Sequence, residues 1–436
     1  MGLGKTIQSI CILASKHFER AERHKATGSL DTVHLPSLII CPPTLTGHWQ
    51  QEIKTYATNL RPLIYTGAKA ERERLLSSFT KYDAVIMSYE IARNDIDALS
   101  EIDWHYCILD EGHIIKNGKT KLTKAIKTLR AVHRLILSGT PIQNNVLELW
   151  SLFDFLMPGF LGSEKAFNDR FGKPIAASRD AKSSSKEQEA GALALEALHK
   201  QVLPFLLRRL KEDVLDDLPP KIIQDYYCEL SPLQKQLYDD FSTSQAKQLV
   251  AGEVSAGGSA KGKPQHVFQA LQYLRKLVNH PALVLKPDVP HHQAIMAKME
   301  QSGGNLRDIV NAPKLGALRS VARSLPPRCL LTHRSPRQIL LDCGIGTSST
   351  ATEAESSLGA VSQHRVLIFC QLKQMLDIVE NDLFRAVMPS VTYMRMDGTT
   401  DVSKRHAVVQ TFNADPSIDC LLLTTHVGGL GLNLTG

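Results

Sequence analysis

Short apolar runs that end in polar or proline residues recur along the first third of the chain. These runs occupy residues 38–44, 82–90, 104–109 and 135–141. Continuous apolar strands with helices between them are typical of a parallel sheet that is covered on both faces. The pattern therefore predicts an α/β lobe whose functional loops lie at the carboxyl ends of the strands.

The same pattern returns near the end of the chain, in residues 365–370, 391–398 and 420–425. We therefore expect an α/β fold with two parallel-sheet lobes. Residues 1–227 would form the first lobe, with a helical insertion at about 149–210. Residues 228–312 would form a helical insertion and linker, and residues 313–436 the second lobe.

Apolar residues at helical spacing predict helices over residues 149–171 and 192–209. The polar residues 183–187 between them are expected to form a mobile tip. A Ser-Pro pair at residues 231–232 predicts the start of a capped helix. Residues 252–262 are rich in Gly, Ser and Ala, and we expect them to be disordered.

Other helical segments leave some alternatives open. The apolar stripe from Phe268 to Val278 is expected to pack inside the protein. The pair Arg208 and Arg209 is either a brace between the lobes or a solvated helix end. A helix should start at Pro313, but residues 319–336 carry three prolines and four arginines and should not continue it. That run is either a surface loop or translated intron sequence.

The first residues of the chain have the character of a phosphate-binding loop. Residues 2–6 read Gly-Leu-Gly-Lys-Thr, which is the second half of the pattern G-x-x-x-x-G-K-[ST]. In that pattern, backbone N–H groups and the lysine hold phosphates, and the Thr hydroxyl reaches Mg²⁺. Gly2, Leu3, Gly4, Lys5 and Thr6 are therefore the expected nucleotide-binding residues. Apolar residues at helical spacing between residues 5 and 23 place a helix directly after them, and the dipole of that helix favours bound phosphate.

A pair of carboxylates about a hundred residues later completes the expected site. Asp110 and Glu111 directly follow the apolar run 104–109. With Lys5 and Thr6 they predict in-line attack of water on the γ-phosphate of ATP. Thr6 and Asp110 would place Mg²⁺, Lys5 would stabilise the transferring charge, and Glu111 would be the base or the water-positioning group. His113 is either a sensor of the nucleotide state or a structural hydrogen-bonding group.

Composition adds little to this interpretation. The chain carries 51 Lys and Arg and 44 Asp and Glu, a net charge of +7, which mildly favours a polyanionic partner. No apolar run approaches the ~20 residues of a membrane span, so we expect no membrane association. The eight cysteines include no C-x-x-C pair, which favours buried free thiols in a reducing compartment over a zinc site.

The ordered motifs resemble those of helicase superfamily 2 ATPases of the Swi2/Snf2 class. The matching segments are residues 2–6, 41–45, 110–113, 138–145, 207–214, 274–284 and 428–434. Within this class, residues 110–117 and 424–436 resemble the Mot-type subfamily, the TATA-binding-protein-associated ATPases of B-TFIID. Most members of the class carry Arg-Ala where this chain has His426 and Val427.

The resemblance implies two RecA-like lobes and a nuclear motor that tracks along double-stranded DNA and strips TATA-binding protein from it. By motif position it implies residues that contact the DNA backbone and residues that couple the nucleotide state to the rest of the motor. The implied DNA-contacting residues are Thr44, Ser88, Thr424 and Thr425. The implied coupling residues are His113, Ser138, Gly139, Thr140, Gly428, Gly429 and Gly431.

Comparison with the class also predicts a fragment that is truncated at both ends. The chain starts after the expected adenine-reading glutamine and stops before the expected arginine fingers, which contribute about 10³–10⁵ in rate in related enzymes. The repeat region through which the subfamily holds TATA-binding protein is absent as well. We therefore expect weak, salt-sensitive binding to duplex DNA and little DNA-stimulated hydrolysis unless both ends are restored.

Two other functions remain open. The chain could be a catalytically inert fragment that still binds DNA or a partner. It could also be an RNA helicase of the same superfamily, which the Swi2/Snf2-type segments at residues 207–209 and 279–284 disfavour.

Overall fold

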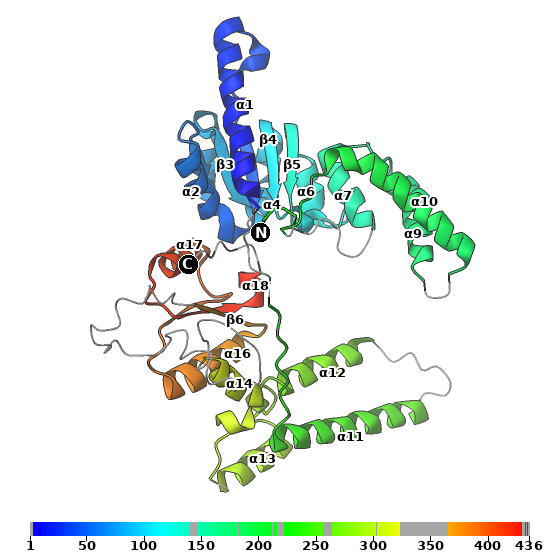
Figure 1. Cartoon of the computed structure of the whole chain (residues 1–436), viewed down its shortest axis with the longest axis vertical. Helices are drawn as coiled ribbons and strands as arrows, with labels where there is room; N and C mark the ends of the chain where they lie inside the picture. The colour runs from blue at the N-terminus through cyan, green and yellow to red at the C-terminus, as the bar shows by residue number, and fades with distance from the viewer. Residues whose placement is uncertain are drawn as a thin grey trace. The chain divides into compact units, whose positions relative to one another are not determined.

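The computed structural model describes residues 3–139, 146–180, 183–211, 213–215, 222–255, 264–301, 303–322, 365–429, 432 and 434 (Figure 1). The chain forms two compact units, Met1–Pro220 and Lys221–Gly429. Among the described residues, none of the helices combines the length and apolar character needed to cross a membrane.

The first unit is built on a five-stranded parallel sheet with the strand order β2-β3-β1-β4-β5. Its strands are β1 (Ser37–Cys41), β2 (Pro62–Ile64), β3 (Ala84–Ser88), β4 (Asp103–Asp110) and β5 (Arg130–Leu137). The predicted parallel sheet is confirmed. The sequence pattern missed β2, because three residues are too few to show a pattern.

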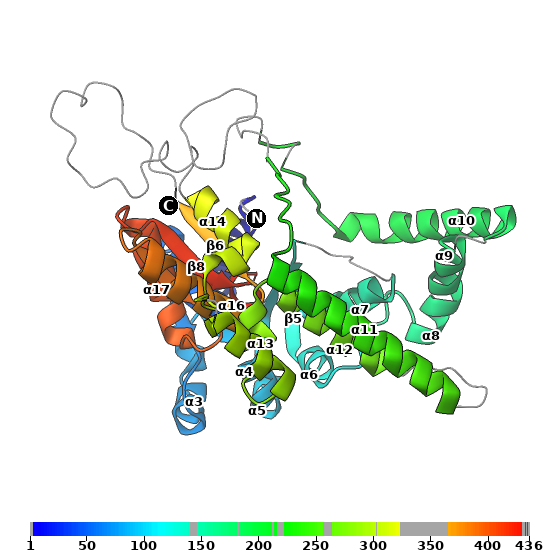
Figure 2. The ribbon, with the colours of Figure 1, turned by 90° about the horizontal axis from the view of Figure 1, so that it is seen from below.

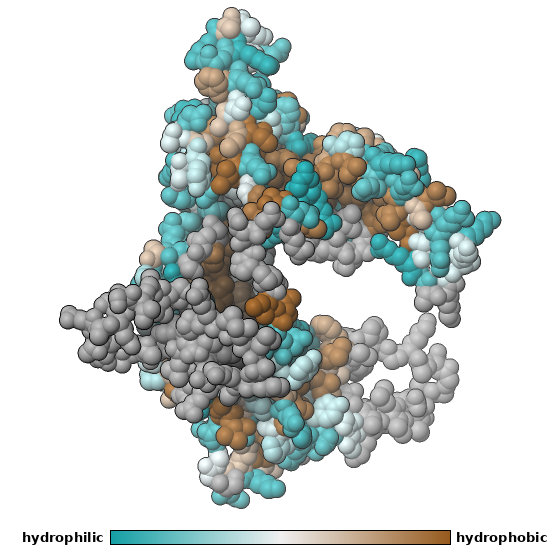
Figure 3. Space-filling view, viewed as in Figure 1, coloured by the Kyte–Doolittle hydropathy of each residue, from teal (hydrophilic) through white to brown (hydrophobic). Residues whose placement is uncertain are grey.

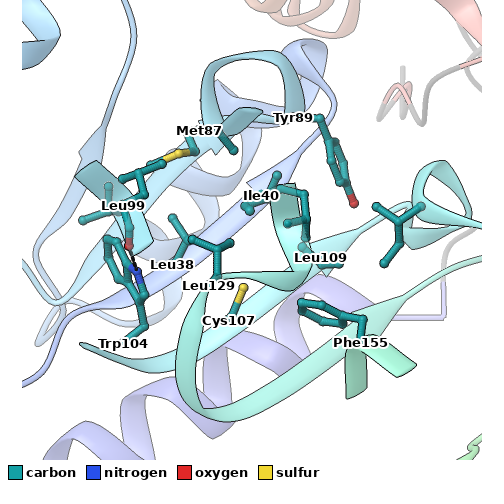
Figure 4. Close-up of a cluster of buried hydrophobic side chains, with 14 of the residues drawn as sticks. Leu38, Ile40, Met87, Tyr89, Leu99, Trp104, Cys107, Leu109, Leu129 and Phe155 are labelled. Atoms are coloured by element: carbon teal, nitrogen blue, oxygen red, sulfur yellow. Dashed lines mark hydrogen bonds between the residues drawn. The ribbon is translucent and has the colours of Figure 1, made fainter. Parts of the chain in front are cut away.

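Alternate residues of the central strands face two separate cores, which explains why the strands are apolar throughout. On one face, Ile39 and Ile108 pack with residues of α1 (Lys5–Thr27) and α2 (Thr46–Tyr56). On the other face, Leu38, Ile40 and Leu109 pack with shorter helices (Figure 4). These helices are α3 (Lys69–Leu76), α4 (Tyr89–Asn94), α5 (Ile96–Ser100), α6 (Lys121–Lys127) and α7 (Val146–Leu156).

A helical extension follows the sheet of the first unit. The expected single helix over 149–171 is wrong, because this segment forms separate helices. Helix α7 ends at Leu156, and α8 (Glu164–Phe167) leads into a π-helix, Asn168–Gly172. Between α7 and α8, Gly159 and Gly162 have φ values of 84° and 73°, which interrupt a right-handed helix. The extension ends with α9 (Lys173–Ser178) and α10 (Ser185–Val202).

Two expectations about α10 are also wrong. Ser184 caps this helix, since its hydroxyl accepts the Glu187 N–H while the Glu187 carboxylate accepts the Ser184 N–H, so most of the expected mobile tip is a helix start. The helix ends at Val202, two residues before Pro204, and not at residue 209. Arg208 and Arg209 therefore lie in an exposed irregular segment and not at a helix end.

Four helices between residues 232 and 322 of the second unit each begin at a proline. They are α11 (Pro232–Ser255), α12 (Pro264–Leu277), α13 (Pro290–Gln301) and α14 (Pro313–Ala322). The helix starts predicted at residues 232 and 313 are confirmed. Residues 252–255 are helical, contrary to expectation, and residues 256–262 lie outside the described chain. Helix α14 continues through Arg319–Ala322, so the first four residues of the 319–336 run do extend it, and the rest of that run is outside the description.

Helices α11 and α12 run side by side (Figure 2). The rings of Phe241 and Tyr273 stack between them, with 4.3 Å between their centroids. The predicted packing stripe on α12 is only partly confirmed. Leu277 is buried, but Phe268 and Leu271 are 63% and 60% exposed.

A second parallel sheet, of three strands in the order β6-β8-β7, is confirmed as predicted. Its strands are β6 (Val366–Cys370), β7 (Tyr393–Met396) and β8 (Cys420–Thr424), and its helices are α16 (Lys373–Ile378), the π-helix Val379–Arg385, α17 (Val402–Ala414) and α18 (Thr425–Gly428). Leu422 of β8 and Leu376 of α16 lie in a core that also receives Leu315 of α14.

Candidate nucleotide-binding site

The start of α1 is shaped to receive an anion. Gly4 precedes the helix with φ 69° and ψ 21°, a left-handed conformation that glycine adopts at little cost. No side chain caps this end of the helix, and its first turn holds no acidic residue. The first backbone N–H groups of α1 and the Lys5 ammonium can therefore face a phosphate. Leu3 and Thr6 are half-buried at this end, whereas Gly2 lies outside the described residues.

Asp110 is the last residue of β4, where parallel pairing brings it beside the ends of neighbouring strands. Its register partner is Leu137 on β5. The carboxylate is only 7% exposed, and two donors fix it: Trp49 Nε1 at 2.9 Å and the Glu111 N–H at 2.9 Å. The hydroxyl of Tyr89 donates to the Asp110 carbonyl at 2.8 Å. Burial, together with the charge of Glu111, raises the pKa of Asp110.

Trp49 and Tyr89 are site residues that the sequence pattern did not identify. Trp49 lies on α2 and is fully buried, four residues before the buried Ile53, so its spacing marks it only as a core residue. A tryptophan N–H needs a partner when it is buried, and here that partner is the Asp110 carboxylate.

Glu111 has φ 51°, the only positive φ of a non-glycine residue in the described chain. This strained turn directs the residue after the strand away from the strand axis. His113 Nδ1 lies 3.2 Å from Glu111 Oε2. The His113 contact is the largest cause that lowers the pKa of Glu111, and the charge of Lys5 and the Gly139 N–H act in the same direction.

The charge of Lys5 lowers the pKa of both Asp110 and Glu111. The structure therefore brings together three of the residues that the sequence analysis selected, at the carboxyl edge of the sheet. Their catalytic roles remain predictions. Burial raises the pKa of Asp110, whereas its neighbours lower the pKa of Glu111, and opposite shifts in two adjacent carboxyls favour different roles for them.

The loop after β5 also reaches this site. The Gly139 N–H is close enough to Glu111 to help lower the pKa of its carboxylate, and the coupling role of this segment remains a prediction. Ser138 is half-buried beside it, and Thr140 lies outside the described residues. A Cβ atom on Gly112 would lie 2.4 Å from Ile136 Cγ2, so the site has no room for a side chain at this position.

The predicted DNA-contacting residues of the first unit lie at the same edge but are buried. Thr44 and Ser88 are 4% and 6% exposed. The Ser88 hydroxyl accepts the Ile91 N–H and thereby caps α4. Contact with DNA through these two hydroxyls remains a prediction. Because both residues are buried, the structure around them would have to shift before DNA could reach them.

In the second unit, the predicted residues surround the start of α18. Thr424 is buried and Thr425 is exposed at the first position of the helix. A Cβ atom on Gly428 would lie 2.5 Å from Phe369 Cε1, and one on Gly429 would lie 2.7 Å from the Thr425 carbonyl oxygen, so both positions require glycine. Gly431 is outside the described residues.

Comparison with known proteins defines the class. Residues 1–283 match the SNF2-related domain, and residues 353–436 match the helicase conserved C-terminal domain. The chain belongs to the SNF2-related ATPase family. The predicted Swi2/Snf2 resemblance is confirmed.

Comparison with individual relatives indicates the subfamily. The TATA-binding protein-associated factor MOT1 of Saccharomyces cerevisiae is 59% identical over 441 residues, and the human TATA-binding protein-associated factor 172 is 58% identical over 445 residues. These matches cover 100% of this chain but only 22% and 23% of the relatives. The resemblance to the Mot-type subfamily is thus confirmed. Among solved structures, the Sulfolobus solfataricus SWI2/SNF2 ATPase core in complex with dsDNA is 26% identical, over 97% of this chain and 72% of that chain, with a TM-score of 0.42.

Proposed function

We propose that this chain is the ATP-hydrolysing motor region of a nuclear TATA-binding-protein-associated factor. The observation that carries the proposal is the convergence of Lys5, Asp110 and Glu111, with the lysine charge acting on both carboxyls. The identity to MOT1 and to factor 172 supports the biological setting. In that setting the motor would move along double-stranded DNA and remove TATA-binding protein from it.

The site fits ATP with Mg²⁺. An uncapped helix start with a left-handed glycine suits the phosphates, and the buried Asp110 carboxylate suits a hard cation. Thr6 and Asp110 would hold Mg²⁺, which neutralises charge on the phosphate oxygens when it is bound.

The chain's own residues would carry out the other parts of ATP hydrolysis. Glu111 would accept a proton from the attacking water as the new bond to the γ-phosphorus forms and the bond to the leaving ADP breaks. Lys5 would stabilise the charge on the transferring group. The Gly139 contact to Glu111 would link the position of this base to the end of β5.

The test is a comparison of nucleotide binding and ATP hydrolysis, with and without duplex DNA. Glu111→Gln should leave ATP affinity within about twofold and lower turnover by ~10²–10⁴, because the amide keeps the shape and loses the proton-accepting charge. Lys5→Ala should weaken ATP binding as well as turnover. Glu90→Gln changes an exposed glutamate on α4 and serves as the matched control. Equal turnover in Glu111→Gln and the unaltered chain would contradict the proposal.

A further inference from the structure

A group of metal-ligand side chains lies at the opposite edge of the first sheet. His17 comes from α1, His34 from the segment before β1, and Asp83 from the position directly before β3. One ring nitrogen of each histidine and one carboxylate oxygen of Asp83 all lie within 4.8 Å of one another. In the part of the chain that is described, no other group of three His, Cys, Asp or Glu residues meets this criterion.

The carboxylate of this group is already fixed in one orientation. Asp83 Oδ2 accepts the Arg61 backbone N–H at 2.8 Å and Arg61 Nε at 2.9 Å. Oδ1 faces His34, whose Nε2 lies 2.8 Å away, and the more distant Arg61 Nη2, at 3.3 Å. Fixing one oxygen of a carboxylate by hydrogen bonds, so that the other can coordinate, is a common feature around protein metal sites.

The two histidines differ in their exposure to solvent. His17 is 8% exposed, and its Nε2 lies 2.8 Å from Ser37 Oγ. The His34 side chain is 36% exposed, which gives an ion a path from solvent.

A third buried histidine lies next to His17. His105 on β4 is 5% exposed, and its ring centroid lies 5.1 Å from that of His17. Its Nδ1 is buried and has no hydrogen-bond partner among the described residues. A buried polar atom without a partner costs free energy, and such atoms are exceptional in folded proteins.

We propose that His17, His34 and Asp83 bind one Zn²⁺ ion, with a water molecule in the fourth position. Two imidazoles, one carboxylate and a water molecule form a ligand set that zinc accepts in four-coordinate sites. This zinc site would contain no cysteine, so the cysteine spacing gives no sign of it.

The position of the group indicates a structural role. His17 is twelve residues beyond Lys5 on the same helix, a separation of about 18 Å along the axis. The ion would join α1 to the segments that enter β1 and β3. The helix that begins at the phosphate-binding loop would thereby be held to the sheet near its middle.

The guanidinium of Arg61 is the main opposing feature, since its charge beside Asp83 repels a cation. It contacts mainly Oδ2, at 2.9 Å from Nε, and lies farther from Oδ1, at 3.3 Å from Nη2. The competing interpretation is that these residues form only a hydrogen-bonded network, and the experiment decides between the two.

The experiment uses residues 1–436 after removal of metals with a chelator. Zn²⁺ alone is titrated in competition with a chromophoric chelator, and thermal unfolding is followed with and without Zn²⁺. We expect one equivalent bound with a dissociation constant below about 1 μM, and a Tm raised by several degrees. Co²⁺ in place of Zn²⁺ should give the intense visible absorption of a four-coordinate site.

Variants test whether Zn²⁺ binds at this group of residues. His34→Gln keeps a side chain that can donate to Asp83, and it should lower the Zn²⁺ affinity at least about tenfold while the metal-free Tm stays close to that of the unaltered chain. His199→Gln changes an exposed histidine on α10 and should leave binding unchanged. Absence of stoichiometric Zn²⁺ binding would overturn the proposal. So would tight binding that persists in His34→Gln, because the ion would then sit elsewhere.

Discussion

At the scale of single residues, the position and the pKa of the Asp110 carboxylate depend on a residue that is far away in sequence. It lies at the end of a buried strand, where desolvation raises its pKa and works against the ionised form that a cation needs. The Trp49 N–H counteracts this by donating to Oδ2 at 2.9 Å. Trp49 is therefore a positioning residue for the proposed Mg²⁺ ligand.

Trp49→Phe removes this donor and keeps most of the buried ring. The carboxylate should become less fixed and more easily protonated, so the Mg²⁺ concentration that supports half-maximal ATP binding should rise about tenfold. Trp104→Phe is the matched control, because Trp104 is also fully buried and donates its ring N–H to the Leu99 carbonyl, away from the site. An equal Mg²⁺ requirement in both variants would remove Trp49 from this role.

At the scale of elements, a buried histidine fixes a short turn in the second unit. His280 is fully buried, and its Nδ1 accepts the Ala282 N–H at 3.1 Å at the start of the 3₁₀-helix Pro281–Leu283. Burial lowers the pKa of His280 to about 4, and the charge of Arg307 adds to the effect. The native state therefore holds this ring neutral below the pH at which it would be protonated in the unfolded chain.

The sign of the pH dependence follows from this. Above pH 6.5 both states hold the ring neutral, and as the pH falls from 6.5 to 4 the unfolded chain binds the proton first. His280 should therefore lower the free energy of unfolding by roughly 1 to 3 kcal/mol over that range. Asn at this position can accept the same N–H but does not titrate, so His280→Asn should lose this part of the pH dependence in urea unfolding at pH 7.5 and 4.5.

The control for this prediction is His292→Asn. His292 Nδ1 accepts the Lys286 N–H in the same manner but is only half-buried. An unchanged pH dependence in His280→Asn, or an equal change in both variants, would contradict the assignment.

At the scale of the whole molecule, charge should govern the interaction with duplex DNA. The net charge is +7, and most of the exposed part of α1 beyond the sheet is hydrophilic (Figure 3). Because the proposed contacts are to phosphate, a plot of log affinity against log salt should be linear with a negative slope, about −0.9 for each phosphate contacted.

Two variants with the same net charge distinguish a local DNA contact at α18 from a general effect of net charge on DNA affinity. Thr425→Asp places a carboxylate at the exposed start of α18, where the resemblance implies a DNA contact, and it should lower the affinity by about tenfold or more and reduce the salt slope by about 1. Thr58→Asp makes the same charge change at an exposed turn before β2 and should have a much smaller effect. Similar losses in fluorescence-anisotropy titrations of the two variants would contradict the placement of DNA at α18.

Local sequence determined a large part of this protein. The apolar runs predicted strands because a strand buried on both faces leaves no polar position, and they were confirmed in both sheets. The segments with Lys5, Asp110 and Glu111 could be selected because phosphate chemistry requires particular residue types next to a helix start or a strand end. Helix ends were predicted less well, as at Ser184 and Val202, because a capping serine and a nearby proline compete with apolar spacing.

Only the tertiary structure decided which side chains meet across long stretches of chain. Trp49 reaches Asp110 from 61 positions away, and His34 lies beside Asp83 from 49 positions away. Neither contact can be predicted from the local spacing of apolar and polar residues. In that spacing, a buried tryptophan is indistinguishable from other core residues, and a single histidine from other polar residues. Parallel pairing aligns the ends of strands that are distant in sequence, and that alignment assembled one group of residues at each edge of the first sheet.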